Sequence, residues 1–369
     1  MKQPLRIVIS GGGTGGHIFP AIAIADAVKR LRPDAEILFT GAKNRMEMSR
    51  VPAAGYSIKG LWISGFQRKL SLQNILFPLK VIVSYFDARS ILRKFKPDCV
   101  IGVGGYASGP TLRAAISLKI KTLIQEQNSY PGVTNRILAG KADRICVAYE
   151  AMEKWFPISK TVLTGNPLRK SAVDTAGKRD EALKFFGLKA SGKVLLIVGG
   201  SQGARAINHG IAAMIESYRD SGIQLVWQTG EAYFPEAIAL VDKAGAGETI
   251  KPLAFIQRMD LAYAAADCLI SRAGAIAISE ISVVGKPVIF VPLPTAAEDH
   301  QTSNARRLVD KNAAVLVHNN DTAKPLFDEV MKLMQDQKRM EQLSESIRKF
   351  ALPEADVLIA QEIIKLTGK

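Results

Sequence analysis

Short apolar runs rich in β-branched residues alternate with amphipathic stretches along the whole chain, and glycines mark the junctions between them. This alternation is typical of parallel βαβ units, in which a helix follows each strand and crosses back over the sheet. The pattern begins again after a turn-rich stretch at residues 164–167, where neither period continues. It therefore predicts an α/β fold with two Rossmann-like, doubly wound domains that face a cleft at the carboxyl ends of their strands.

The chain of 369 residues is long enough for two domains that each bury a core. We place the domains at residues 1–164 and 165–352, and we expect the segment 353–369, with a helix at 355–366, to pack back on the first domain. The predicted strands are 5–10, 36–40, 99–103, 122–125, 144–148, 194–198, 224–228, 250–252, 268–271, 288–291 and 314–316. The predicted helices of the first domain are 18–31, 44–54, 72–94, 111–118 and 132–138.

Basic residues are concentrated in the first 160 positions, which hold 24 Lys and Arg against 10 Asp and Glu, a net charge of +14 out of +15 for the whole chain. This asymmetry favours an anionic partner for the first domain, either nucleic acid or an anionic membrane surface. Solubility alone is the remaining alternative. With 47% hydrophobic and 22% charged residues, the chain is neither disordered nor fibrous.

Residues 61–96 mix apolar and basic side chains, as suits an anionic membrane interface. An amphipathic core helix is the alternative, above all for Ile75, Leu79 and Val83. The segment 61–96 contains Trp62, Phe66, Leu72, Ile75, Leu76, Phe77, Leu79 and Val83 with Arg68, Lys69, Lys80, Arg93, Lys94 and Lys96.

Residues 7–25 are also apolar, but five glycines and Pro20 interrupt them. We therefore expect neither an export signal nor a membrane span there. The protein is expected to be soluble or peripheral.

The three cysteines, Cys99, Cys146 and Cys268, lie far apart in apolar runs, without CxxC or Cys/His ligand spacing. They are typical of buried, reduced thiols in a cytosolic protein. No Asp-x-Asp motif occurs either. We therefore expect no metal and no other cofactor.

Four glycine-rich turns follow predicted strands and open helices, at residues 11–16, 102–110, 199–203 and 272–275. Each such turn places backbone N–H groups and a helix N-terminus at a strand end, which makes a site for an anion such as phosphate. Two turns lie in each domain, so the sequence predicts two phosphorylated ligands.

The first turn also matches GxGxxG through Gly11, Gly13 and Gly16, so a dinucleotide enzyme has to be considered. Binding of NAD additionally needs an acidic residue at the end of the second strand to hold the ribose diol. That strand ends in Thr40 and Gly41, which disfavours a nicotinamide enzyme. A P-loop ATPase is disfavoured because GxxxxGK[ST] does not occur in the chain.

Six sequence blocks follow one another along the chain: GGGTGGHIFPAIAIA, GVGGYASGP, QEQN, TGNPLR, GGSQGARAIN and SRAGA…SEI…GKPVIFVPLP. Together they resemble the MurG family of N-acetylglucosaminyltransferases, over residues 7–308. The resemblance implies a glycosyltransferase B fold and an inverting transfer of GlcNAc from UDP-GlcNAc. The implied acceptor is the 4-hydroxyl of the MurNAc-pentapeptide of undecaprenyl-pyrophosphate-linked lipid I, so that the product is lipid II for peptidoglycan. The implied location is the cytoplasmic face of the bacterial cell membrane, as a peripheral protein that binds no nucleic acid.

The resemblance assigns roles at the ends of the first domain's strands. His17 ends the first glycine turn, where its imidazole could take the proton of the acceptor hydroxyl. A helix-capping or donor-orienting histidine is the alternative. Positions matched to donor contacts are Thr14, Gly15, Gly16 and Asn128, and positions matched to the acceptor pyrophosphate are Gly13, Gly104, Gly105 and Tyr106.

In the second domain the resemblance implies a site for UDP. Glu280 can accept hydrogen bonds from both ribose hydroxyls, and a surface or first-turn glutamate is the alternative. Arg169 and Ser201 are expected to hold the diphosphate as the leaving group's charge develops, and for Arg169 a surface arginine is the alternative. The resemblance further implies that the α-phosphate lies at the backbone N–H groups of Ala275, Ile276 and Ala277, and that Ile278 and Ser279 belong to the same donor-binding helix. It implies that Ile256 contacts uracil and that Gln301 contacts a sugar hydroxyl.

The sequence departs from the best-known members at two places. Gln125 stands where they have histidine, and His300–Gln301 stands where they have paired glutamines. No role is carried over to Gln125, and we expect His209 and His318 to be structural or exposed. The enzymatic alternatives are a UDP-GlcNAc 2-epimerase or another UDP-sugar transferase of the same fold. The epimerase would turn over UDP-GlcNAc without an acceptor. A basic nucleic-acid-binding protein would show steep salt-dependent binding unaffected by UDP.

Overall fold

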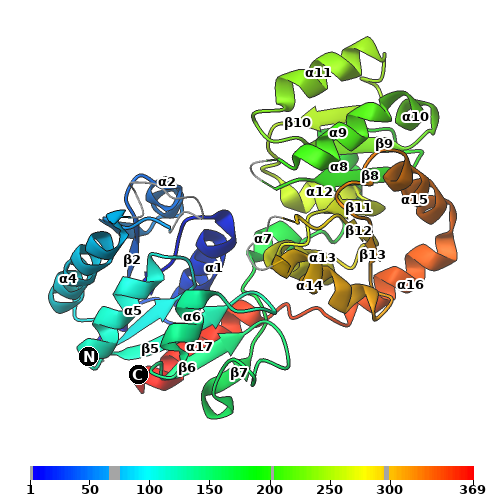
Figure 1. Ribbon diagram of the computed structural model, residues 1–369. Helices are drawn as coiled ribbons and strands as arrows, with labels where there is room; N and C mark the ends of the chain where they lie inside the picture. Colours follow the sequence, from blue (N-terminus) through cyan, green and yellow to red (C-terminus); the bar gives the residue numbers. More distant parts are fainter. Residues whose placement is uncertain (1–2, 66–74, 201–202, 295–298) are drawn as a thin grey trace. The chain divides into compact units, whose positions relative to one another are not determined.

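The computed structural model describes residues 3–65, 75–200, 203–294 and 299–369, and the chain divides into two compact units (Figure 1). The first unit comprises Met1–Arg169 and Leu352–Lys369, and the second comprises Lys170–Ala351. The first unit extends beyond the expected boundary at residue 164, because the turn that follows is buried within it. Asn166 Nδ2 donates to Gln127 O at 3.1 Å there.

The first unit is built on a seven-stranded parallel sheet in the order β3-β2-β1-β4-β5-β6-β7. Its strands are β1 (Arg6–Ser10), β2 (Glu36–Ala42), β3 (Ser57–Leu61), β4 (Cys99–Gly102), β5 (Lys121–Glu126), β6 (Arg144–Val147) and β7 (Thr161–Leu163). Its helices are α1 (Gly15–Leu31), α2 (Glu47–Ala53), α4 (Phe77–Phe95), α5 (Ser108–Ser117), α6 (Val133–Ala139), the short 3₁₀ helix η1 (Ile158–Lys160) and α17 (Ala355–Thr367).

Helices cover both faces of this sheet, because successive side chains of a strand point to opposite faces. Ile7 and Ile9 of β1 pack in a core with α1 and α17, while Val8 packs in a second core with α4, α5 and α6. Strand β1 is therefore apolar at consecutive positions, as expected for a central strand of a buried parallel sheet.

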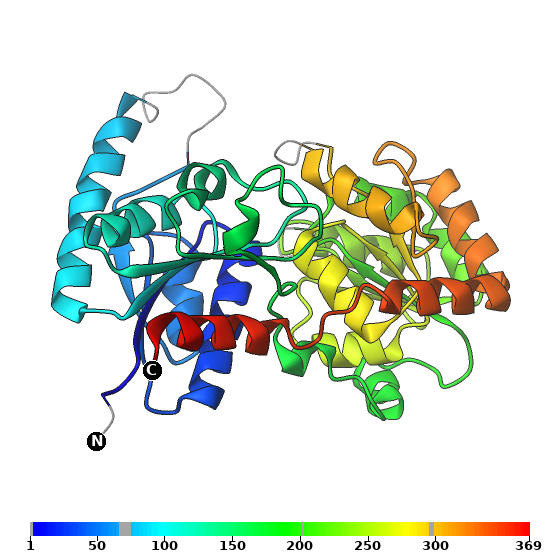
Figure 2. The same cartoon turned by 90° about the horizontal axis from the view of Figure 1, so that it is seen from below.

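The last helix, α17, returns to the first unit and packs beside α1 (Figure 2). Its Ile359, Ala360 and Ile363 are fully buried in the core that α1 shares. An Asp356–Arg30 ion pair ties α17 to α1. The C-terminal helix therefore completes the hydrophobic cover on one face of the first sheet.

We expect Ile363→Ala to destabilise the protein by about 2–5 kcal/mol, the usual cost of truncating a fully buried isoleucine. Leu358→Ala on the same helix is the control, since Leu358 is 41% exposed and leaves little cavity. Thermal denaturation of both variants measures the difference. Equal melting temperatures for the two variants would contradict the packing of α17.

The second unit has a six-stranded parallel sheet in the order β10-β9-β8-β11-β12-β13. Its strands are β8 (Val194–Val198), β9 (Gln224–Gln228), β10 (Ile250–Leu253), β11 (Cys268–Ser271), β12 (Val288–Phe290) and β13 (Val315–Leu316). Its helices are α7 (Lys170–Val173), α8 (Arg179–Phe185), α9 (Arg205–Ala213), α10 (Ile215–Asp220), α11 (Phe234–Lys243), α12 (Met259–Ala265), α13 (Ala275–Val284), α14 (His300–Val309), α15 (Lys324–Gln335) and α16 (Gln337–Arg348). The side chains of β8 again alternate between two cores, so this unit is doubly wound as well.

Candidate active site

In the first unit the loops after β1, β4 and β5 carry the predicted site residues. The carboxyl ends of parallel strands lie at one edge of a sheet, and β1 and β5 both pair with β4. His17, Gly104 and Asn128 therefore share that edge. Loops placed there on a rigid sheet are the usual position of a ligand site in this fold class.

His17 lies in the first turn of α1, half-buried against the glycine turn after β4. Its Nδ1 lies 3.3 Å from Thr14 Oγ1. A Cβ on Gly104, which has φ +87°, would lie 2.9 Å from His17 Cδ2, and one on Gly105 would overlap the Gly12 carbonyl oxygen. Only glycine lets the two loops interlock this closely around the imidazole.

Glu47 supports the first glycine turn, a role that sequence reasoning missed. This carboxylate is 1% exposed and accepts hydrogen bonds from Gly13 N at 3.1 Å and from Ala42 N at 2.9 Å. The ring of Tyr106 covers Gly13 on another side, and burial raises the pKa of that tyrosine. The Gly13 N–H predicted for the acceptor pyrophosphate is thus donated to Glu47.

Glu126 orients the loop that carries Asn128. It is buried, and its carboxylate accepts from the backbone N–H groups of Asn128 and Gly132 and from Asn135 Nδ2. Burial raises the pKa of Glu126, while these hydrogen bonds oppose that rise. Asn128 is thereby held at the sheet edge.

Gln125, to which no role was assigned, belongs to a buried polar network. Its Nε2 donates to Asn166 Oδ1 at 3.2 Å, and its Oε1 accepts from Gln127 Nε2. Gln127 also donates to Val103 O at 2.8 Å. The network joins the turn after β4 to the Gly165–Asn166 turn, so Gln125 has a structural position here.

Arg169 is exposed, and its guanidinium lies over the ring of Phe19, 4.5 Å from the centroid. Phe19 stands on α1 two residues after His17, so this cation–π contact brings Arg169 to the N-terminal part of the helix that carries the predicted base. The contact orients the guanidinium and leaves it accessible to an anion.

The second unit has a cavity of about 800 Å³ at the carboxyl ends of its strands. Of the predicted residues, Ala277 and Gln301 line it, together with the glycine turns that follow β8 and β11. The predicted Ser201 lies outside the described residues. The lining comprises Val198, Gly199, Gly200, Gly203, Ala204, Arg205, Ala206, His209, Ser271, Arg272, Gly274, Ala277, Leu293, Pro294, Gln301 and Asn319.

Helix α13 begins at Ala275 after Gly274, whose extended backbone caps the helix without a side-chain bond. The first-turn N–H groups of Ala275, Ile276 and Ala277 carry the positive end of the helix dipole. Further along α13, Ile278 is buried and the Ser279 hydroxyl donates to Ala275 O at 3.0 Å. Both residues therefore stabilise α13, the helix that is predicted to bind the phosphate of the donor.

Glu280 is positioned by Tyr263, whose hydroxyl donates to Glu280 Oε2 at 2.9 Å. The carboxylate is half-buried on α13, and it does not appear among the residues that line the 800 Å³ cavity. A carboxylate held in this way keeps further lone pairs for hydroxyl donors.

Polar side chains brace the loops of this cavity. Gln301 Oε1 accepts from Leu293 N at 3.0 Å. Gln228 accepts from Ile256 N at 3.0 Å and donates to Gly200 O at 2.9 Å, so Ile256 is tied to the glycine turn after β8. The side chain of Ile256 is 3% exposed and lies in the core.

Arg272 was recognised only as part of a turn, but it joins the ends of two strands. Its Nη1 donates to Val291 O, Pro292 O and Asn319 Oδ1 at 2.8–3.1 Å. Burial lowers the pKa of Arg272 to about 10. The arginine therefore lines the cavity as a fixed cation.

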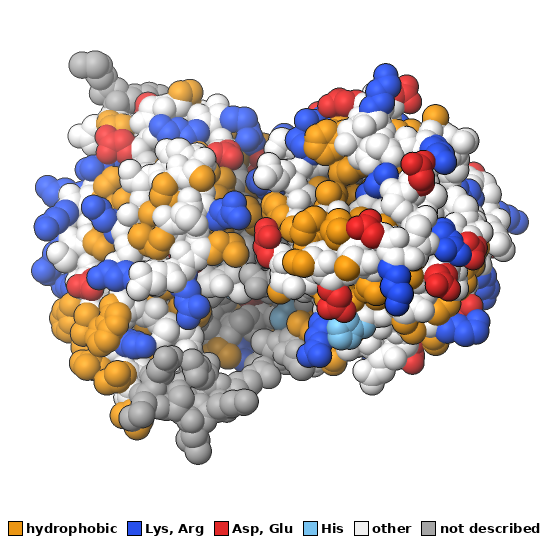
Figure 3. All heavy atoms as spheres, turned by 90° about the horizontal axis from the view of Figure 1, so that it is seen from above, with side chains coloured by type: hydrophobic (Ala, Val, Ile, Leu, Met, Phe, Trp, Pro, Cys, Tyr) orange, Lys and Arg blue, Asp and Glu red, His pale blue; other side chains and the backbone are white. Residues whose placement is uncertain are grey.

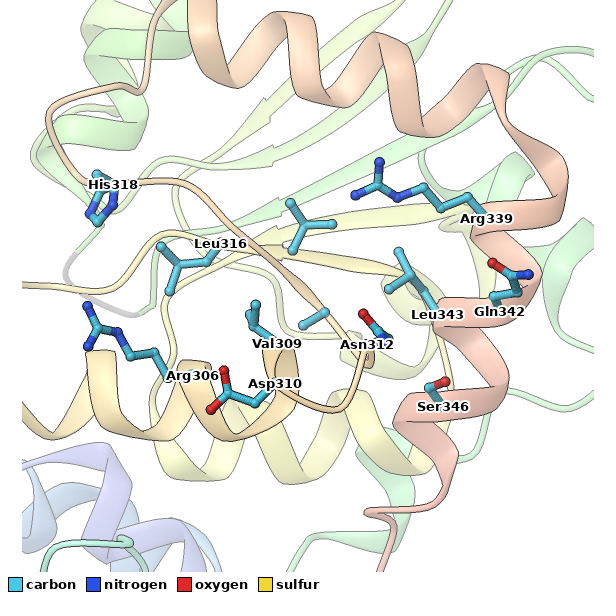
Figure 4. A pocket seen from close by; sticks show the side chains of 12 residues that line it. Arg306, Val309, Asp310, Asn312, Leu316, His318, Arg339, Gln342, Leu343 and Ser346 are labelled. Atoms are coloured by element: carbon cyan, nitrogen blue, oxygen red, sulfur yellow. The ribbon is translucent and has the colours of Figure 1, made fainter.

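A separate cavity of about 1210 Å³ lies on the outer edge of the second sheet (Figure 4). The cavity is lined by Arg306 of α14, by Asp310 just after that helix, and by Arg339, Gln342 and Ser346 of α16. It contains none of the predicted site residues. His318 borders this cavity and His209 the other, and both histidines are exposed as expected.

Within the described ranges, no three His, Cys, Asp or Glu side chains are grouped so that they could hold a metal ion. All three cysteines are free and buried, as predicted. No described helix combines the length and apolar character needed to cross a membrane.

Two parallel-sheet, doubly wound α/β units with glycine turns at their strand ends are the architecture of the glycosyltransferase B fold, which confirms the predicted α/β fold class. Models of the glycosyltransferase family 28 N-terminal and C-terminal domains match residues 7–147 and 194–359. The chain belongs to glycosyltransferase family 28, and within it to the MurG N-acetylglucosaminyltransferases.

Two curated relatives show how close this relation is. Proteins of Christiangramia forsetii and Bacteroides thetaiotaomicron are 52% and 51% identical over 366 and 367 residues, which is 99% of each chain. Both are named UDP-N-acetylglucosamine–N-acetylmuramyl-(pentapeptide) pyrophosphoryl-undecaprenol N-acetylglucosamine transferase.

Solved structures agree on the fold. Acinetobacter baumannii MurG is 29% identical with a TM-score of 0.79, over 98% of this chain and 100% of its own. The UDP-GlcNAc 2-epimerase of Neisseria meningitidis has a TM-score of 0.70 at 16% identity, covering 98% of this chain and 100% of its own. The second likeness shows the fold alone.

Proposed function

We propose that this glycosyltransferase moves GlcNAc from UDP-GlcNAc to the 4-hydroxyl of the MurNAc-pentapeptide of undecaprenyl-pyrophosphate-linked lipid I, giving lipid II. The observation that carries the proposal is the 52% identity over 99% of both chains to a transferase named for this reaction. The position of His17 between two glycine turns supports it, since a proton acceptor is needed beside the acceptor site.

In the proposed reaction the acceptor oxygen attacks the anomeric carbon of GlcNAc and the bond from that carbon to UDP breaks. His17 takes the hydroxyl proton. The first turn of α13 and the guanidinium of Arg169 stabilise the negative charge that develops on UDP. Glu280 holds the ribose. This division of roles needs no metal or other cofactor.

The stereochemistry of the product tests this reaction. UDP-GlcNAc carries an α-linked sugar, so a single displacement must give a β-linked disaccharide on the lipid. Incubation of the protein with UDP-GlcNAc and lipid I, followed by NMR of the disaccharide, measures the linkage. An α-linked product would overturn the inverting mechanism, and free 2-epimerised UDP-sugar would favour an epimerase instead.

We also infer that the protein docks as a peripheral protein at the cytoplasmic face of the membrane, and an exposed apolar surface on α4 supports this. Ile75, which just precedes α4, and Leu79, Ile82 and Phe86 on α4 recur at helical spacing. They are 74%, 49%, 54% and 60% exposed. The core-helix alternative is therefore wrong for Ile75 and Leu79. Phe66, Arg68, Lys69 and Leu72 of the predicted segment lie outside the described residues.

The charge around this surface fits an anionic membrane. Figure 3 shows hydrophobic side chains gathered near one edge of the first unit, with Lys and Arg side chains around them. Lys80 lies over the ring of the exposed Trp62, and Arg89, Arg93 and Lys94 follow on α4. Each cation near an anionic bilayer contributes about 1 kcal/mol, which favours reversible docking of the first unit. We expect no binding to nucleic acid.

Replacing Ile82 and Phe86 together by glutamate is expected to abolish binding to vesicles that contain anionic lipid, because two charges would have to enter the apolar interface. Ile158→Glu is the matched control, since Ile158 is 74% exposed on the same unit but lies on η1. Vesicle co-sedimentation measures both. Unchanged binding by the α4 double variant would contradict the assignment.

A further inference from the structure

Glu47 is a buried carboxylate at the candidate active site that the reaction described above does not use. It is 1% exposed and opens helix α2. A carboxylate in the first turn of a helix is often explained by the helix dipole. Here, however, its two oxygens accept from backbone N–H groups of two loops, Gly13 after β1 and Ala42 at the end of β2.

The glycines around Glu47 leave room for it. A Cβ on Gly12 would overlap Glu47 Oε1, and one on Gly41 would lie 2.6 Å from Glu47 Cγ. The carboxylate therefore occupies the space that side chains at these two positions would fill. Burying a charged carboxylate is costly unless hydrogen bonds compensate the lost hydration. The burial of Glu47 against the first glycine turn therefore calls for an explanation.

The reason follows from what lies on the turn. Gly13 precedes Thr14, whose hydroxyl contacts His17 at 3.3 Å. The hydrogen bond from the Gly13 N–H to Glu47 fixes the start of α1, and it thereby fixes the Thr14–His17 pair. Because the Gly13 N–H donates to Glu47, it is not available to an anion. The N–H groups of this turn that can bind an anion are therefore those in the first turn of α1.

We propose that Glu47 is a positioning residue for transfer: its bidentate hold on Gly13 and Ala42 sets the first glycine turn so that His17 and the N-terminus of α1 meet the acceptor. This inference rests on the proposed function. A displacement of about 1 Å at a reacting group costs about 10²-fold in rate, so a loosened turn affects catalysis more than folding.

Steady-state kinetics of Glu47→Gln test the proposal, with donor and acceptor varied separately. The amide keeps one acceptor oxygen but turns an NH₂ group toward the second backbone donor. We expect kcat to fall about 10- to 100-fold and the KM for lipid I to rise. The KM for UDP-GlcNAc is expected to stay within about twofold, because the predicted contacts of UDP, apart from Arg169, lie in the second unit. A kcat and an acceptor KM within about twofold of wild type would overturn the proposal.

Asp356→Asn is the matched control, since Asp356 is also 1% exposed and lies in the same unit, but pairs with Arg30 between α1 and α17. It is expected to lower the melting temperature and leave kcat within about twofold. If Glu47→Gln fails to fold, Glu47→Asp, which keeps the charge but cannot reach both donors, is expected to show the same split in kinetic constants. Absence of acceptor-dependent UDP release by wild type would defeat the proposed function instead.

Discussion

His17→Ala is expected to lower kcat for transfer about 10²- to 10⁴-fold, the range that general base catalysis contributes. The imidazole is half-buried between two glycine turns and is within 3.3 Å of Thr14 Oγ1, so it is held in one place rather than moving freely at the surface. Binding of UDP, measured by calorimetry, should remain within about twofold because its predicted contacts, apart from Arg169, lie in the second unit.

His17→Asn separates the base from the alternative role in orienting the donor. Asparagine can still hydrogen-bond near Thr14, but it cannot take up a proton at neutral pH. If His17 is the base, the asparagine variant is as inactive as the alanine variant and the KM for UDP-GlcNAc is unchanged. An active asparagine variant, or a loss confined to that KM, would assign His17 to donor orientation.

Glu280→Gln is expected to reduce kcat/KM for UDP-GlcNAc about 10- to 150-fold, which corresponds to the loss of one charged hydrogen bond of about 1.5–3 kcal/mol. The variant keeps an oxygen for the Tyr263 hydroxyl, so the side chain can remain in place. Steady-state kinetics with the donor varied measure the loss. A change of less than twofold would mean that Glu280 is only a surface glutamate; the first-turn alternative is wrong, because α13 begins at Ala275 and has no acidic residue in its first turn.

Two comparisons make this test specific for the ribose. Tyr263→Phe removes the hydroxyl that positions Glu280 but leaves the carboxylate itself in the site. We therefore expect a smaller loss of about 2- to 10-fold, which corresponds to the net contribution of a typical hydrogen bond, about 0.5–1.5 kcal/mol. A 2′-deoxyribose analogue of the donor should be a poor substrate for wild type, whereas for Glu280→Gln it should be nearly as good as UDP-GlcNAc. Additive losses would contradict a direct contact between Glu280 and ribose.

The central strands of the second sheet could be predicted to the residue because they are buried on both faces. The predicted strands 194–198, 224–228 and 268–271 match β8, β9 and β11 at both ends. The edge strands β3 and β7 were missed, since their exposed and half-buried residues do not form an apolar run. Edge strands receive their structure from one neighbour, and sequence periodicity does not reveal that pairing.

In the candidate site, too, local features could be predicted from the sequence, whereas features that depend on distant residues could not. Glycine turns after strands are visible in the sequence because only local geometry is involved. Glu47, Gln228 and Arg272 could not be found in this way, since their partners Gly13, Gly200 and Asn319 lie 34, 28 and 47 positions away. Helical spacing likewise shows that α4 is amphipathic, but only the tertiary structure shows that its apolar face is exposed.

The most direct test of the account is the release of UDP from UDP-GlcNAc by the wild-type protein, measured with and without lipid I. We expect release only when the lipid-linked acceptor is present, with one lipid II formed for each UDP. Release without acceptor, or no release in its presence from a folded protein that binds UDP, would contradict transfer to lipid I.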